Sequence, residues 1–114
     1  MPNPQQQTAI AGAIDAIRNA EILLTAQIRA STDTLQAIKL THEYNNLDFQ
    51  LSALLHAQNG ADDAAFQAAT ATLKSQSTTL QADIAAIKRI VADVALAGKI
   101  VSDITRALSF IAKL

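Results

Sequence analysis

Apolar side chains recur along this sequence with the spacing of one helix face, in two long stretches separated by Asn59-Gly60. Apart from the step between Ile38 and Leu40, neighbouring members are three, four or seven residues apart, which is the period of an amphipathic α-helix. The first stretch holds Ile10, Ile14, Ile17, Leu24, Ile28, Leu35, Ile38, Leu40, Tyr44, Leu47, Leu51 and Leu54, and the second holds Phe66, Leu73, Leu80, Ile84, Ile87, Val91, Val94, Val101 and Leu108. No Gly or Pro occurs between residues 13 and 58. The pattern predicts an all-α protein.

Two helical arms of nearly equal length follow from this pattern. They are expected at about residues 4–58 and 62–113, joined by a turn at 59–61, and together they form a single domain. At about 1.5 Å per residue, two continuous arms would make an antiparallel hairpin roughly 75–80 Å long. The expected fold is therefore a long, coiled-coil-like helical hairpin.

Capping signals stand at the start of each arm. Asn3 and Gln6 have the spacing of a capping box, and Pro4 suits the first helical position. After the turn, Asp62 and Asp63 fall where carboxylates favour a helix N-terminus. Asn59-Gly60 is expected to supply left-handed conformations that end the first arm.

Charged residues on the two arms are arranged symmetrically about the turn, and we call this arrangement the charge mirror. When the arms are aligned antiparallel, residues of opposite charge lie opposite each other. The residue numbers of each pair sum to between 120 and 122. The pairs are Asp15 with Arg106, Arg18 with Asp103, Glu21 with Lys99, Arg29 with Asp93, Asp33 with Lys88 and Arg89, Lys39 with Asp83, and Asp48 with Lys74. Glu43 is the exception, since it meets neutral Ser77 and Thr78. The mirror predicts a defined register for the hairpin.

An interruption of the first arm is a second interpretation of the same pattern. The apolar stripe shifts between Ile38 and Leu40, as a stutter in a coiled coil does. The segment Ser31-Thr32-Asp33 could cap a new helix instead. The alternative fold is then a monomeric bundle in which both arms bend, with the first break near Ser31–Asp33.

The hairpin carries more apolar surface than one seam between two helices can cover. The additional positions form a candidate interaction face made of Ile90, Ile100, Ile104, Ile111, Ile22 and Leu23. A second copy of the chain is the simplest cover, and it would complete a four-helix bundle. The expected state is therefore a homo-oligomer, either a dimer or a tetramer.

Both arms become polar at one level of the predicted hairpin. The side chains concerned are His42, Tyr44, Asn45, Ser77 and Thr78. We interpret them as a hydrogen-bonded layer that fixes the register, as polar core residues do in coiled coils. A recognition patch or a bending point is the alternative.

Catalytic and metal-binding patterns are not found in the sequence. The two histidines, His42 and His56, have no carboxylate or histidine one turn away, and the three glycines are isolated. No nucleophile has a base and an orienting group at helical spacing. We expect no enzymatic activity, no metal and no cofactor.

Charge and composition limit the class of partner. The net charge of −1 and the shortness of the basic run Lys88-Arg89 argue against nucleic-acid binding. The chain has no cysteine, and its N-terminus lacks the basic and apolar regions of a signal peptide. The expected location is the cytoplasm, or outside the cell after export by a route that needs no signal peptide.

Two functions remain open on the sequence. The first is a non-enzymatic, self-associating helical interaction module, such as a structural subunit, an adaptor or a small chaperone of a larger assembly. The second is a membrane-active hairpin that forms pores or binds lipid surfaces. It would use the apolar segment 84–114, which carries a net charge of +3 while the rest of the chain carries −4.

Overall fold

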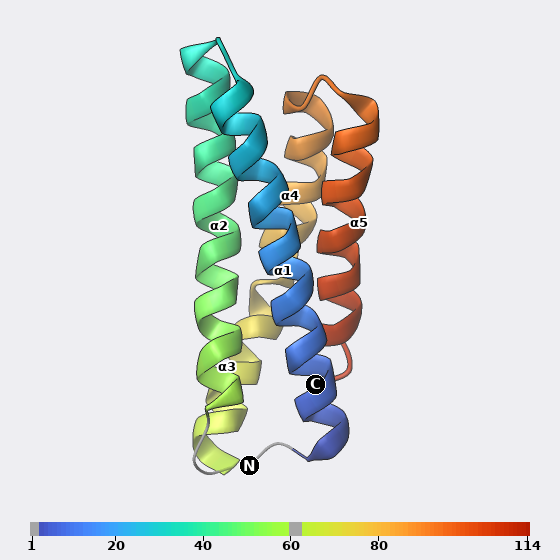
Figure 1. Cartoon of the computed structure of the whole chain (residues 1–114). Helices are drawn as coiled ribbons and strands as arrows, with labels where there is room; N and C mark the ends of the chain where they lie inside the picture. The colour runs from blue at the N-terminus through green and yellow to red at the C-terminus, as the bar shows by residue number, and fades with distance from the viewer. Residues whose placement is uncertain (1–2, 60–62) are drawn as a thin grey trace.

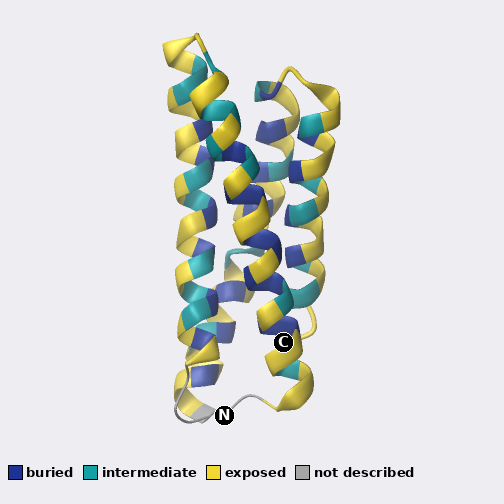
Figure 2. Cartoon of the chain, viewed as in Figure 1, coloured by how far each residue is buried: buried dark blue, intermediate teal, exposed yellow. Residues whose placement is uncertain are grey.

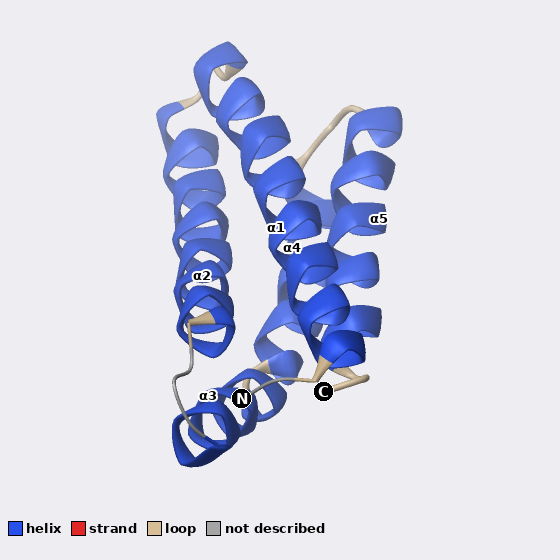
Figure 3. Ribbon diagram, turned by 60° about the horizontal axis from the view of Figure 1, so that its bottom comes forward, coloured by secondary structure: helices blue, strands red, loops and turns tan. Residues whose placement is uncertain are grey.

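Helix is the regular structure throughout the described part of the chain, residues 3–59 and 63–114 of a computed structural model (Figure 3). The five helices in these residues are α1 (Pro4–Ala30), α2 (Thr34–Gln58), α3 (Asp63–Ser75), α4 (Ser77–Ile90) and α5 (Val94–Ile111). The all-α class predicted from the sequence is confirmed.

The helices form a four-column bundle within one chain (Figure 1). α1 runs upward, α2 returns, α3 and α4 continue upward as one kinked column, and α5 returns beside α1. The molecule measures 47 × 21 × 20 Å. The prediction of continuous arms 75–80 Å long is therefore wrong, because each arm reverses its direction once, at 31–33 and at 91–93, and the hairpin is folded in half.

The two bends are short extended segments that each end on an aspartate cap. Ser31 has φ −75° and ψ 128°, and the Asp33 carboxylate accepts a hydrogen bond from the backbone N–H of Leu35 at 3.0 Å. Val91 has φ −82° and ψ 113°, and Asp93 accepts from the backbone N–H of Ala95 at 3.0 Å. In a continuous helix, each of these N–H groups would bond to a carbonyl of the preceding turn. At the break the aspartate carboxylate accepts that hydrogen bond instead, and this stabilises the break.

The other helix boundaries agree in part with the capping prediction. Asn3 and Gln6 form the expected capping box at the start of α1, and Pro4 is its first residue. Asn59 ends α2 with φ −94°, so the left-handed conformation expected there is wrong for this residue. The predictions for Gly60, Ala61 and Asp62, which include most of the predicted turn, lie outside the described residues.

A kink at Gln76 separates α3 from α4. The Ser75 hydroxyl donates to the carbonyl of Thr72 at 2.9 Å, and the Ser77 hydroxyl donates to the carbonyl of Lys74 at 2.6 Å. Hydroxyl groups bonded back to carbonyls of the preceding turn compete with the helical ladder and bend it. The second arm is thus interrupted at Gln76 in addition to its break at 91–93.

Buried side chains line the inner faces of all four columns (Figure 2). Where α1 packs on α5, the core is built of isoleucine and alanine, and an ideal Cβ on Gly12 would lie only 2.6 Å from the Phe110 ring. These two residue numbers sum to 122, so the register predicted for this pair of helices is found here.

The register is different where α2 packs on α4. The Asn46 side-chain amide donates to Asp83 at 3.1 Å, and their numbers sum to 129. Asp83 therefore faces Asn46 rather than the predicted Lys39. Within residues 3–59 and 63–114, the ion pair shorter than 4 Å joins Arg106 to Asp103 on the same helix. The charge mirror thus predicted the alignment of α1 with α5, but its cross-arm ion pairs are not formed.

Candidate functional site

The predicted interaction face is divided between the core and the surface. Ile100, Ile104 and Ile111 are buried within this chain, while Ile90 and Leu23 are half-buried. The expectation that a second copy covers the three isoleucines is wrong for this structure, because folding the hairpin in half packs α5 against α1, α4 and α3.

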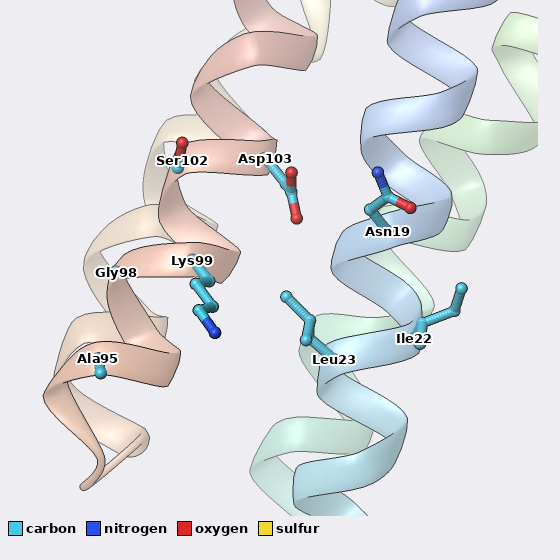
Figure 4. A pocket seen from close by; sticks show the side chains of 8 residues that line it. All are labelled: Asn19, Ile22, Leu23, Ala95, Gly98, Lys99, Ser102 and Asp103. Carbon is cyan, nitrogen blue, oxygen red and sulfur yellow. The ribbon is translucent and has the colours of Figure 1, made fainter.

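Ile22 is the member of this face that stays exposed, at 66% of its surface. Leu23 points from α1 toward α5, whereas Ile22 points away from it (Figure 4). Leu23, Lys99 and Asp103 line a shallow groove between the two helices. The predicted interaction face is therefore not continuous. Its solvent-accessible members are the separate side chains Ile22 and Leu23 on α1 and Ile90 on α4.

The two halves of the predicted polar layer do not lie opposite each other, because Asn46 bonds to Asp83 and Gln50 bonds to Gln76. His42, Asn45 and Thr78 are exposed, and Tyr44 and Ser77 are half-buried. The buried polar side chains of this region belong instead to neighbouring positions on the inner faces, namely Glu43, Gln50, Thr70 and Asp83. The prediction of which residues form the layer is thus wrong for the three exposed members.

Glu43 and Asp83 form a buried carboxyl pair between α2 and α4. Their exposed fractions are 6% and 2%, and one oxygen of each has no hydrogen-bond partner. Burial, together with the adjacent Asp83, raises the pKa of Glu43 from 4.5 to about 8, while Arg89 opposes the rise. At neutral pH, Glu43 is therefore largely protonated, so the pair holds a proton within the bundle.

A second buried carboxyl lies between α1 and α2. Glu21 is 6% exposed, and burial together with Asp48 raises its pKa to about 7, against opposing contributions from Tyr44 and Arg18. Tyr44 in turn has a raised pKa, chiefly because of the charge on Glu21. The predicted pairing of Glu21 with Lys99 is replaced by this contact with Tyr44 and Asp48.

Glutamine side chains of α2 form hydrogen bonds to the second arm. Gln50 donates to the side-chain oxygen of Gln76 at 2.7 Å, across the kink between α3 and α4. Gln36 donates to the backbone carbonyl of Ile90 at 2.8 Å, next to the second break. These bonds fix α2 against the second arm, which is the structural role expected for a polar layer.

The sequence contains a signal for these residues that lies outside the apolar stripe. Along α2 the buried positions alternate three and four residues apart, and every second one is polar. They are Leu40, Glu43, Leu47, Gln50 and Leu54. Following apolar residues alone therefore misses Glu43 and Gln50, although Glu43 was already the exception in the charge mirror.

The chemistry open to this arrangement is proton binding and hydrogen bonding in the helix interfaces. Across residues 3–59 and 63–114, no three His, Asp or Glu side chains are grouped as a metal ion would need. No helix in that same part of the chain is long and apolar enough to cross a membrane.

Comparisons with known proteins give no relative for this chain. No family model, no curated protein and no solved structure matches it.

Proposed function

We propose that this protein is a non-enzymatic, self-associating helical module, acting as a structural subunit, adaptor or small chaperone of a larger assembly. Two copies associate by opening at residues 31–33 and 91–93 and exchanging the halves of their hairpins. The product is an extended four-helix bundle built from two hairpins, each roughly 75–80 Å long at about 1.5 Å per residue.

The position of the two breaks carries this proposal. Residues 31–33 and 91–93 lie at the same end of the bundle (Figure 1). They divide the chain into a proximal half, α1 with α5, and a distal half, α2 with α3 and α4. Opening both breaks together would separate the halves without disturbing the helix pairing inside either one.

The contacts between the halves can be formed equally well by a second copy. In the closed chain, α1 packs on α2 and α4 packs on α5. After exchange, the same side chains would meet between two chains, so the core is kept and only the connections change. Exchange of identical elements is a low-cost route to a dimer, and short connections between the elements favour it.

Helix continuity decides which form is favoured. Asp33 and Asp93 stabilise the closed form by capping the helices that follow them. Replacing the break residues by good helix formers removes the caps and favours uninterrupted arms. Continuous arms cannot fold back, so the long apolar face must then be covered by another copy.

A break-filled variant tests the proposal. It combines Ser31→Ala, Thr32→Ala, Asp33→Ala and Asp93→Ala. Light scattering and small-angle X-ray scattering should show a mass twice the 12.1 kDa of the chain and a particle longer than 47 Å. The matched control carries four alanine substitutions at exposed helical positions, namely Thr41→Ala, Ser52→Ala, Thr78→Ala and Ser109→Ala.

The control should keep the mass and shape of the unaltered protein. A break-filled variant that stays at the mass of one chain and remains compact would overturn the proposal. So would a dimer formed without lengthening, because it would join two closed bundles rather than exchanged halves. Far-UV circular dichroism confirms in each case that the helices have formed.

A further inference from the structure

We infer that the end of the bundle that carries both breaks docks on an anionic lipid surface. This break end comprises residues 24–40 and 84–100, the two helical turns on either side of each break. The inference is independent of the proposed exchange of halves, because the closed single chain already presents this end to its surroundings.

Positive charge is concentrated at the break end. It holds five of the nine basic residues and two of the ten acidic ones, so its net charge is +3 while the rest of the chain carries −4. The basic residues are Arg29, Lys39, Lys88, Arg89 and Lys99, and all five are exposed. Basic clusters of this size are attracted to anionic headgroups.

The two acidic residues at this end cap the helices that follow them. Asp33 and Asp93 both accept hydrogen bonds from backbone N–H groups of the helices they cap, at 3.0 Å. The helix dipoles balance, since α1 and α4 end here and α2 and α5 begin here. The five exposed cations outnumber these two carboxylates by three, so an approaching surface meets a net positive field.

Exposed aliphatic side chains accompany these cations. Val94 is 85% exposed, Ile38 60% and Leu35 59%, and these are three of the five large apolar side chains that lie open to solvent in the described residues. Val94 starts α5 and Leu35 lies in the first turn of α2, so both are at the tip of the bundle. Aliphatic side chains beside cations can enter the headgroup region while the cations stay at its surface.

The shape of this end favours a bilayer over a folded partner. The break end is one of the two ends of an elongated bundle, and its tip consists of the two connections α1–α2 and α4–α5 (Figure 1). Its exposed apolar side chains come from α2 and α5, which are separate columns, and the groove between α2 and α4 is lined by Leu35 but not by Ile38 or Val94. A flat, deformable and negatively charged surface can contact all of them at once.

Vesicle co-sedimentation tests the inference with the intact chain. The protein should bind vesicles of phosphatidylcholine with phosphatidylserine, bind pure phosphatidylcholine weakly, and be released by salt. Each cation near an anionic surface contributes about fivefold to partitioning. The variant Lys39→Gln with Lys88→Gln should therefore bind about 25-fold more weakly. The matched control is Lys74→Gln with Lys113→Gln, which removes two cations elsewhere.

A second pair of variants tests the apolar side chains. Leu35→Gln with Val94→Gln should lower partitioning by about tenfold, since two exposed aliphatic groups no longer enter the lipid. Ile22→Gln with Phe49→Gln removes two exposed apolar side chains away from the break end and should leave binding unchanged. All four positions are on the surface, so the fold is kept, and thermal melting verifies this.

Three results would overturn the inference. One is equal binding to neutral and anionic vesicles. Another is an equal loss in the break-end variants and in their controls. The third is no vesicle binding together with salt-sensitive self-association, which would show that the basic end meets the acidic part of another copy.

Discussion

The proximal and distal halves of the bundle have the same helical layout but cores of different chemistry. The proximal core is built of isoleucine, alanine and leucine, and Glu21 at its boundary with α2 is its buried charged residue among those the structure describes. In the distal half, Glu43, Gln50, Thr70 and Asp83 are interleaved with the apolar side chains.

This difference determines how the stability of each half depends on pH. An apolar core gains from burial at every pH, whereas a buried carboxyl with a raised pKa makes folding depend on proton concentration. We therefore expect the proximal half to supply most of the stability, and the distal half with Glu21 to supply the pH dependence.

The largest expected effect comes from placing a carboxylate in the proximal core. Ile104 is fully buried in α5, so Ile104→Asp should cost more than about 4 kcal/mol and leave little folded protein at neutral pH. Chemical denaturation followed by circular dichroism measures this. Thr105→Asp, at the exposed neighbouring position, should change stability little, and similar losses from both variants would contradict the proposed packing of α5.

The pH dependence of stability is the next largest effect. Folded Glu21 and Glu43 keep their protons up to about pH 7 and pH 8, while the unfolded chain loses them near 4.5. The unfolding free energy should therefore be highest near pH 4.5 and fall as pH rises to about 8. The slope is about 1.4 kcal/mol per pH unit for each carboxyl.

Glu43→Gln separates the contribution of the distal pair from the rest. It should stabilise the protein at pH 8 and reduce the slope, because an uncharged amide replaces a carboxyl that must otherwise ionise beside Asp83. Asp48→Asn should lower the pKa of Glu21 instead, since it removes the neighbouring acid. A stability profile that is flat between pH 5 and pH 8 would contradict both assignments.

A smaller effect is expected from the amide pair of the distal half. Gln76→Ala leaves the side-chain amide of Gln50 without its partner in a buried position and should cost about 1–2 kcal/mol. Replacing both residues by leucine should recover most of that loss. A double variant no more stable than Gln76→Ala would show that this layer does more than satisfy its own hydrogen bonds.

The smallest effects are expected at two glycines of the proximal half, and they should have opposite signs. Gly98→Ala places a methyl group in open space within α5 and should stabilise by about 0.5–1 kcal/mol. Gly12→Ala places one within 2.6 Å of the Phe110 ring, so α1 and α5 must shift and stability should fall. Equal shifts in melting temperature would contradict the close packing of α1 on Phe110.

The sequence predicted the helical class and the start of α1, because apolar periodicity and capping are local signals, and the charge mirror predicted the register of α1 with α5. It offered the break at Ser31–Asp33 only as an alternative, since Ser, Thr and Asp also occur on exposed helix faces. The break at Val91–Asp93 was not identified, because Val91 and Ala92 fit a continuous apolar helix.

The composition of the buried polar layer could not be predicted either. It depends on how far α4 is displaced relative to α2, which follows from the kink at Gln76 rather than from the charge mirror. A displacement of seven residues, about 10 Å along the helix, places Asp83 opposite Asn46 instead of Lys39 and buries it beside Glu43. Such register changes are set by tertiary packing and leave little trace in the sequence.

Single-molecule energy transfer within one chain tests the folded hairpin and its opening most directly. The chain has no cysteine, so two dyes can be attached through Thr8→Cys and Gln58→Cys, at exposed positions of α1 and α2 at the end opposite the breaks. In isolated molecules, transfer should be high because α2 returns beside α1. In a large excess of unlabelled protein, a population with almost no transfer should appear, since the dyes of an extended chain are about 75 Å apart. High transfer in dimers would contradict the exchange of halves, and low transfer in isolated molecules would contradict the folded hairpin.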